Sequence, residues 1–183
     1  FAPRFIANIE GVAARIVDTM LTEVASQGSS FDCMNDFANH LIVRILLDGL
    51  LGMSVEQRTV MSRMHEAFAL IIDMPPGGTY PDEYLQAQQA ALQVVAEVIA
   101  ERRAHPRELD FVSAMVAAQS ESGRINDAEM IGNIFAITGA GLGTTASATG
   151  AMLMNLCKHR DQFDQIVANR ALIPQAVEEC LRY

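Results

Sequence analysis

Apolar side chains recur at intervals of three and four residues along most of the chain, and runs of strict alternation are scarce. This periodicity is typical of amphipathic helices rather than of strands. Loops are indicated by the proline- and glycine-rich stretch 74–78 and by His105-Pro106. The pattern, which contains no internal repeat, predicts an all-α fold with helices over approximately these ranges: 6–21, 33–50, 54–73, 81–103, 109–119, 126–157, 161–167 and 174–182.

Three of these helices carry local start signals. Ser54 with Gln57, and Asn126 with Glu129, match the capping box, in which the side chains at the N-cap and at N3 each bond the other residue's backbone amide. Pro174 suits the first turn of the last helix, where an amide hydrogen would have no helical partner.

Composition and charge narrow the class of protein. Half of the 183 residues are hydrophobic and 19% are charged, which is typical of a globular chain that can bury a substantial core. Thirteen Lys and Arg against 22 Asp and Glu give a net charge of −9. Because nucleic-acid binders need the opposite balance, we expect no nucleic-acid partner.

The cysteines and histidines show no spacing typical of a metal site. Three cysteines are far apart in the sequence and form no C-x-x-C pair, which argues against disulfides and structural zinc and predicts a reducing, cytoplasmic location. Surface or helix-end positions are expected for the four histidines: His40, His65, His105 and His159. The first residues show no signal-peptide pattern and no starting Met, so we expect a piece of a larger domain.

The predicted central helix carries the most unusual stretch of the sequence. No charged residue occurs between Met130 and Cys157, and positions 138–145 read Thr-Gly-Ala-Gly-Leu-Gly-Thr-Thr. Each glycine inside a helix costs about 1 kcal/mol relative to alanine, and threonine hydroxyls that bond the preceding turn bend a helix. The stretch therefore predicts that another group comes close to the helix backbone here.

On the residues alone, three interpretations of this stretch stay open. It is long and uncharged and contains Gly139-x-x-x-Gly143, as membrane-spanning helices do, although Asn155 would be poorly solvated in lipid. Residues 135–141 could instead be a strand that leads into a dinucleotide-binding turn, although Thr145 replaces the closing glycine. In the third interpretation, the small residues only allow two helices to pack closely.

Two motifs resemble those of the cytochromes P-450. Residues 140–145, Ala-Gly-Leu-Gly-Thr-Thr, are similar to the family's central-helix pattern Ala/Gly-Gly-x-Asp/Glu-Thr-Thr, and Glu179 with Arg182 resembles its K-helix pattern Glu-x-x-Arg. Upstream, residues 1–4 and 110–116 resemble segments of bacterial members. The resemblance covers essentially the whole chain, 1–183, and corresponds roughly to the D to K helices of one partial domain.

The resemblance implies a haem-dependent monooxygenase without a membrane span. In the complete enzyme it would insert one oxygen atom of dioxygen into a small organic substrate, with electrons from a ferredoxin-type partner. Thr144 would assist oxygen activation, while Glu179 and Arg182 would be structural members of a buried ion network. The residues expected to form the oxygen groove and the substrate pocket are Ala136, Gly139, Ala140, Gly141, Gly143 and Thr145. The residues expected to face haem and substrate share one helical face: Ala136, Gly139, Ala140 and Thr144.

Two departures from the family pattern limit this expectation. The chain stops before the loop whose cysteine binds the iron, and none of its cysteines replaces that ligand, so we expect a fragment that does not hold haem stably alone. Gly143 stands where the family has a proton-relaying acid, so Gly143→Asp in a full-length protein should improve the coupling of reductant to product. The alternatives are a non-catalytic remnant without haem binding and, less favoured, a nucleotide-binding oxidoreductase fragment.

Overall fold

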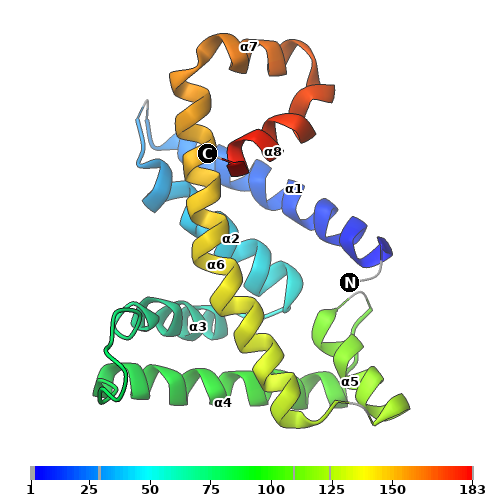
Figure 1. Cartoon of the computed structure of the whole chain (residues 1–183). Coiled ribbons are helices and arrows are strands. Elements are labelled where there is room, and N and C mark those ends of the chain that lie inside the picture. Colours follow the sequence, from blue (N-terminus) through cyan, green and yellow to red (C-terminus); the bar gives the residue numbers. More distant parts are fainter. Residues whose placement is uncertain (1–2, 29, 109, 124, 183) are drawn as a thin grey trace.

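The structure, a computed structural model, describes residues 3–28, 30–108, 110–123 and 125–182, and within these ranges it contains helices and turns but no strand (Figure 1). The all-α prediction is therefore confirmed. Phe1, Ala2 and Leu109, which the sequence analysis used, lie outside the described residues. In chain order the elements are α1 (Pro3–Ser26), η1 (Cys33–Ala38), α2 (Asn39–Val43), η2 (Arg44–Leu50), α3 (Val55–Phe68), α4 (Asp82–Ala104), α5 (Phe111–Ser122), α6 (Asp127–Lys158), α7 (Arg160–Ala168), η3 (Arg170–Leu172) and α8 (Ile173–Arg182).

Both predicted capping boxes are present. At the start of α3, the Gln57 amide donates to Ser54 Oγ at 3.3 Å and the Ser54 amide donates to Gln57 Oε1 at 3.0 Å. At the start of α6, the Glu129 amide donates to Asn126 Oδ1 at 3.0 Å and the Asn126 amide donates to Glu129 Oε2 at 2.8 Å. Local sequence therefore determines where these two helices begin.

Two predicted helices differ from the structure. The helix predicted over 33–50 is continuous, but its first and last parts are π-helical turns, which are wider than α-helical ones. The next helix ends at Phe68 rather than near residue 73, and residues 69–73 form turns with bonds such as that from Leu70 N to Ala67 O at 3.0 Å. Because the Leu70 side chain is exposed, burial does not favour a longer helix here.

The long helix α6 packs against two separate groups of helices. Its buried residues recur at every fourth position: Met130, Ile134, Thr138, Leu142, Ala146 and Gly150. Four residues turn a helix by about 400°, so this stripe moves round the helix by about 40° at each step. The first part of the stripe therefore packs in a core with α3, α4 and α5, and the later part packs in a core with α1, η1 and α2 (Figure 1).

The C-terminal end of α4 is held by a buried arginine. Arg102 is 2% exposed, and its guanidinium donates from Nε to Asp110 Oδ1 at 3.1 Å and from Nη2 to Gly52 O at 2.8 Å. Asp110 also caps α5 by accepting the Ser113 amide at 2.7 Å. Gly52 has a φ of +59°, and a Cβ there would lie 2.6 Å from Arg102 Nη2. One guanidinium therefore connects α4, the start of α5 and the turn after η2.

Two alternative interpretations of the central stretch can now be compared with the structure. Residues 135–137 lie inside α6, so the proposed strand before a dinucleotide-binding turn is wrong. In the part of the chain that the structure describes, no helix combines the length and the apolar character that crossing a bilayer requires.

Replacing Arg102 by methionine should lower the free energy of unfolding by about 3–5 kcal/mol, because it leaves the Asp110 carboxylate buried without its cation. Urea unfolding followed by circular dichroism measures this loss. Arg103→Met is the matched control, because Arg103 is 39% exposed and its partner Asp127 is 59% exposed. The control should lose about 1 kcal/mol or less, and equal losses in the two variants would contradict the role given to Arg102.

Candidate functional site

The glycine-threonine stretch forms the middle of α6, and one side of the helix is exposed there. Thr138 and Leu142 are buried on the opposite side. Gly141 and Gly143 are half-buried and Thr145 is exposed. The exposed side is shallow because its residues are small: Ala136, Gly139, Ala140 and Thr144.

The Thr144 hydroxyl bonds its own helix. It donates to Ala140 O at 2.5 Å, in the same way that the Thr149 hydroxyl donates to Thr145 O at 2.8 Å. With its hydrogen used in this way, Thr144 Oγ1 keeps lone pairs that can accept a hydrogen bond at the exposed face. To donate a proton to a bound molecule, the hydroxyl must first rotate away from Ala140 O.

Other side chains approach α6 closely at two glycines of the glycine-threonine stretch. A Cβ on Gly141 would lie 3.2 Å from Leu46 Cδ2, and a Cβ on Gly143 would lie 3.3 Å from His65 Cε1 and 3.4 Å from His65 Nε2. At Gly139 nothing lies within 4 Å of such a Cβ. The predicted close approach to the backbone is therefore confirmed at Gly141 and Gly143, where it comes from η2 and α3.

The imidazole of His65 thus lies beside the position where the resembling family carries an acid. His65 is in the last turn of α3, which agrees with the expected helix-end position. Its side chain is half-buried rather than on the surface, and its Nδ1 is buried without a hydrogen-bond partner. A carboxylate introduced at Gly143 would meet this ring.

A cavity of about 280 Å³ lies between α3, α4 and α6. Sequence reasoning identified Ala136 and Gly139 from its lining but missed the contributions of α3 and α4, because neither helix carries a motif. The only available signal was the apolar spacing of Met61, Met64 and Phe68. The lining residues are Met61, Met64, His65, Phe68, Tyr84, Gln88, Phe135, Ala136, Thr138 and Gly139.

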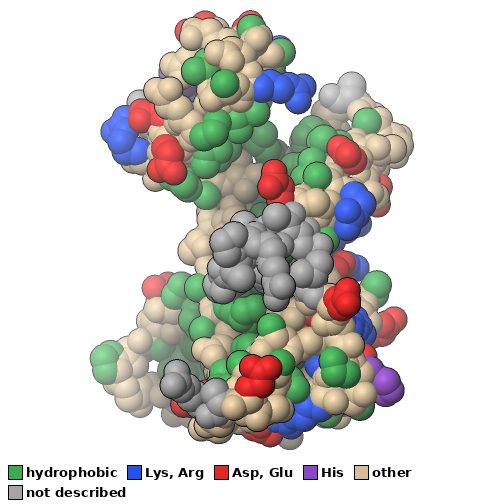
Figure 2. Space-filling view, turned by 90° about the vertical axis from the view of Figure 1, so that its right-hand side faces the viewer, with side chains coloured by type: hydrophobic (Ala, Val, Ile, Leu, Met, Phe, Trp, Pro, Cys, Tyr) green, Lys and Arg blue, Asp and Glu red, His purple; other side chains and the backbone are tan. Residues whose placement is uncertain are grey.

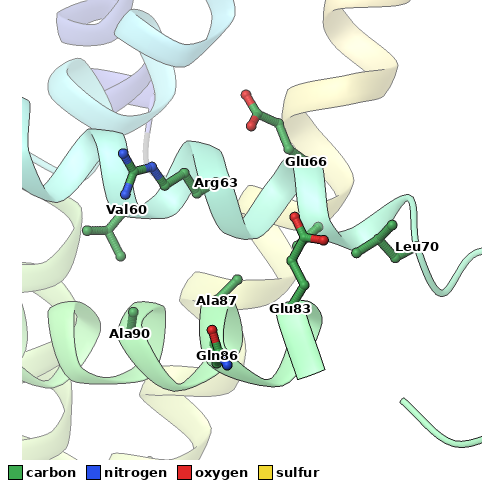
Figure 3. A pocket seen from close by; sticks show the side chains of 9 residues that line it. Val60, Arg63, Glu66, Leu70, Glu83, Gln86, Ala87 and Ala90 are labelled. Atoms are coloured by element: carbon green, nitrogen blue, oxygen red, sulfur yellow. The ribbon is translucent and has the colours of Figure 1, made fainter. Parts of the chain in front are cut away.

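A second hollow, of about 530 Å³, lies between α3 and α4 (Figure 3). Arg63 and Glu66 extend from α3, and Glu83 rises from α4 beside Leu70 (Figure 3). Small-molecule sites are mostly apolar with a few polar groups. The cavity next to α6 fits that description better than this charged hollow does.

A third hollow is apolar and contains two of the cysteines. Cys33 and Cys157 line a groove of about 690 Å³ between η1 and the end of α6. Burial raises the pKa of the Cys33 thiol, and Cys157 and Asp32 raise it further, so this thiol is protonated near neutral pH. The surface is notched in its upper half, with hydrophobic side chains on both walls of the notch (Figure 2).

The exposed face of α6 offers a surface to a flat group, and Cys157, the cysteine on the same helix, lies far from it. The small side chains at Ala140 and Thr144 leave room for a planar molecule to approach α6. Cys157 lies thirteen residues beyond Thr144 on the same helix, which is about 20 Å. Within the described ranges, no group of three or more His, Cys, Asp or Glu side chains could hold a metal ion.

Glu179 and Arg182 form a two-bond ion pair on α8. Arg182 Nε lies 3.0 Å from Glu179 Oε2, and Arg182 Nη2 lies 2.6 Å from Glu179 Oε1. The Glu179 side chain is 54% exposed and the Arg182 side chain is 67% exposed in this chain, and the buried network that the resemblance implies stays a prediction for the complete domain. The Arg182 hydrogen bonds lower the pKa of the Glu179 carboxyl. In this geometry the pair stabilises one turn of α8, because the two residues lie three apart on a helix.

Comparison with known proteins identifies a family. The family model for cytochrome P450 matches residues 2–178. The polyketide biosynthesis cytochrome P450 PksS of Bacillus subtilis is 28% identical over 183 residues, which are 100% of this chain and 43% of that protein. The steroid C26-monooxygenase of Mycolicibacterium smegmatis is 27% identical over 92% of this chain and 41% of its own length. The chain thus spans less than half the length of these relatives.

Solved structures give the same result. The LnmZ cytochrome P450 hydroxylase from the leinamycin pathway of Streptomyces atroolivaceus superposes with a TM-score of 0.81 at 26% identity, covering 98% of this chain and 47% of that one. Epothilone B-bound cytochrome P450epoK gives a TM-score of 0.84 at 24% identity, covering 100% of this chain and 46% of that one, which supports the fold.

Alanine substitutions at Gly139 and Gly143 should change the free energy of unfolding by different amounts, because only Gly143 has a side chain close to its backbone. Gly139→Ala should stabilise the chain by about 1 kcal/mol, the helix preference of alanine over glycine. Gly143→Ala should gain less, because its Cβ meets the His65 ring at 3.3 Å. Urea unfolding of both variants, and of Gly143→Ala in a His65→Ala background, measures the difference. The background change should restore the missing gain, and equal gains at the two glycines would show that the ring exerts no constraint.

Proposed function

Because the chain belongs to the cytochrome P450 family, we propose that residues 1–183 form the central helical part of a haem-dependent monooxygenase domain. The complete enzyme inserts one oxygen atom from dioxygen into a small organic substrate. The observation that carries the proposal is the exposed small-residue face of α6 beside the cavity between α3, α4 and α6. The oxygen groove and the substrate pocket can therefore lie next to each other along α6.

The haem, when bound, supplies the iron at which dioxygen is activated. Ala140 and Gly141 would form the oxygen groove, because neither carries a side chain larger than methyl, although Leu46 takes the side of Gly141 to which a Cβ would point. Thr144 Oγ1 accepts a hydrogen bond at this face and, after rotating away from Ala140 O, can pass on a proton. Ala136, Gly139, Gly143 and Thr145 continue the lining, while Glu179 and Arg182 stabilise α8.

The family's chemistry also requires electrons and a substrate. We assign the electron supply to a ferredoxin-type protein and the location to the cytoplasm, a reducing compartment that suits three free cysteines. The relatives named for polyketide biosynthesis and for steroid C26 oxidation belong to different substrate classes. These two relatives therefore indicate no single substrate for this chain.

Thr144→Ala is the direct test, made in a chimera in which residues 1–183 replace the matching segment of the Bacillus subtilis relative. The ratio of product formed to reductant consumed should fall several-fold, because the hydroxyl at the α6 face is lost. Thr149→Ala is the control, because Thr149 makes the same kind of backbone bond one helical turn further along. Equal ratios in the two variants would contradict the role of Thr144. A chimera without a thiolate-type carbonyl spectrum would favour the non-catalytic remnant.

Gly143→Asp in the same chimera tests the departure from the family motif. The carboxylate should raise the product-to-reductant ratio by adding a proton-transferring group next to Thr144. Since the new side chain meets His65, the substitution is also made together with His65→Ala. No gain in either background would count against the proton-relay explanation.

A further inference from the structure

His65 is the one polar group in the lining of the α3–α4–α6 cavity that makes no hydrogen bond to any described residue. The Thr138 hydroxyl donates to Ile134 O and Phe135 O, at 2.9 and 3.1 Å. Tyr84 and Gln88 bond each other at 3.2 Å. The imidazole therefore keeps its full bonding capacity, whereas Thr138, Tyr84 and Gln88 each already make at least one hydrogen bond.

A neutral imidazole has one N–H donor and one unprotonated acceptor nitrogen. Leaving such a group buried and unpaired is unfavourable, so a molecule that completes its bonding gains affinity. A hydroxyl can do this for either tautomer, because it both donates and accepts. A carbonyl oxygen can only accept.

The remaining lining of the cavity indicates what the rest of a bound ligand, beyond its hydroxyl group, must be like. Met61, Met64, Phe68 and Phe135 supply an apolar, partly aromatic wall, and the described residues that line the cavity include no Lys, Arg, Asp or Glu. Its volume of about 280 Å³ is at the lower end of ligand sites, which occupy about 300–1,000 Å³. This environment fits a small neutral apolar molecule.

We infer that His65 is the specificity-determining polar anchor of this cavity and that the substrate is a small, neutral, mainly apolar molecule with a hydroxyl group. Gly143 is required for this position of the imidazole, because a side chain at residue 143 would push the ring away from α6. The inference rests on the proposed function, since it takes this cavity as the substrate site. Its binding step, however, does not depend on haem.

Two probes of similar shape test the inference on the whole 183-residue chain: 2-naphthol and 2-methylnaphthalene. Equilibrium titration should give about tenfold tighter binding of 2-naphthol, the value of roughly one net hydrogen bond. His65→Phe should bring the ratio of the two affinities close to one while keeping the apolar binding. His40→Phe, on the exposed side of α2, is the control and should keep the tenfold ratio.

A measurement on the unsubstituted chain removes any dependence on how a variant folds. In long-range proton–nitrogen NMR spectra, 2-naphthol should shift the ring nitrogens of His65, and 2-methylnaphthalene should shift them much less. Gly143→Val should abolish both this difference and the affinity ratio.

Three results would overturn the inference: equal affinities for the two probes, no binding of either, or a tenfold ratio that survives His65→Phe. The proposed function is tested separately by the effect of Thr144→Ala in the chimera. If that effect is present without a His65-dependent preference, the monooxygenase proposal stands and the hydroxyl anchor is wrong. If the preference is present without an effect of Thr144→Ala, the cavity binds its ligand but the proposed role of α6 fails.

Discussion

The structure depends on one geometric constraint, which is that α6 must pack against two cores with a single helix. Buried residues at every fourth position carry its contact surface round the helix, from the core containing Ile134 to the core containing Leu142 and Ala146. The exposed side of α6 between these regions contains Ala136, Ala140 and Thr144. The same constraint that holds the helices together therefore leaves a strip of small residues available for a ligand.

The glycines in the middle of α6 have two different roles. At Gly141 and Gly143 the missing side chain makes room for Leu46 and His65. Packing at these positions therefore offsets the lower helix propensity of glycine. At Gly139 the space beside the backbone is open and adjoins the α3–α4–α6 cavity. Packing explains the first two positions, whereas no described side chain explains the third.

The sequence determines much of this fold locally and little of the site. The starts of α3 and α6 could be predicted because each capping box lies within four consecutive residues. The end of α3 and the π-helical turns could not be predicted, because tertiary packing decides them. The role of His65 was also beyond the sequence, since its neighbour Gly143 belongs to a different helix and no spacing rule relates the two. The ion pair of α8 follows from the i, i+3 spacing of Glu179 and Arg182, and its role in the complete domain stays a prediction.

The crowding around Gly52 has an evolutionary consequence. The positive φ restricts this position, and so do Arg102 Nη2 at 2.6 Å and Asp110 Oδ2 at 2.9 Å from any added Cβ. If a descendant replaced the whole ion pair by short residues, the backbone restriction would become the main one, and asparagine would become acceptable because it tolerates left-handed conformations. Positions 52, 102 and 110 should therefore change together among descendants of this chain, with the ion pair enforcing glycine at position 52.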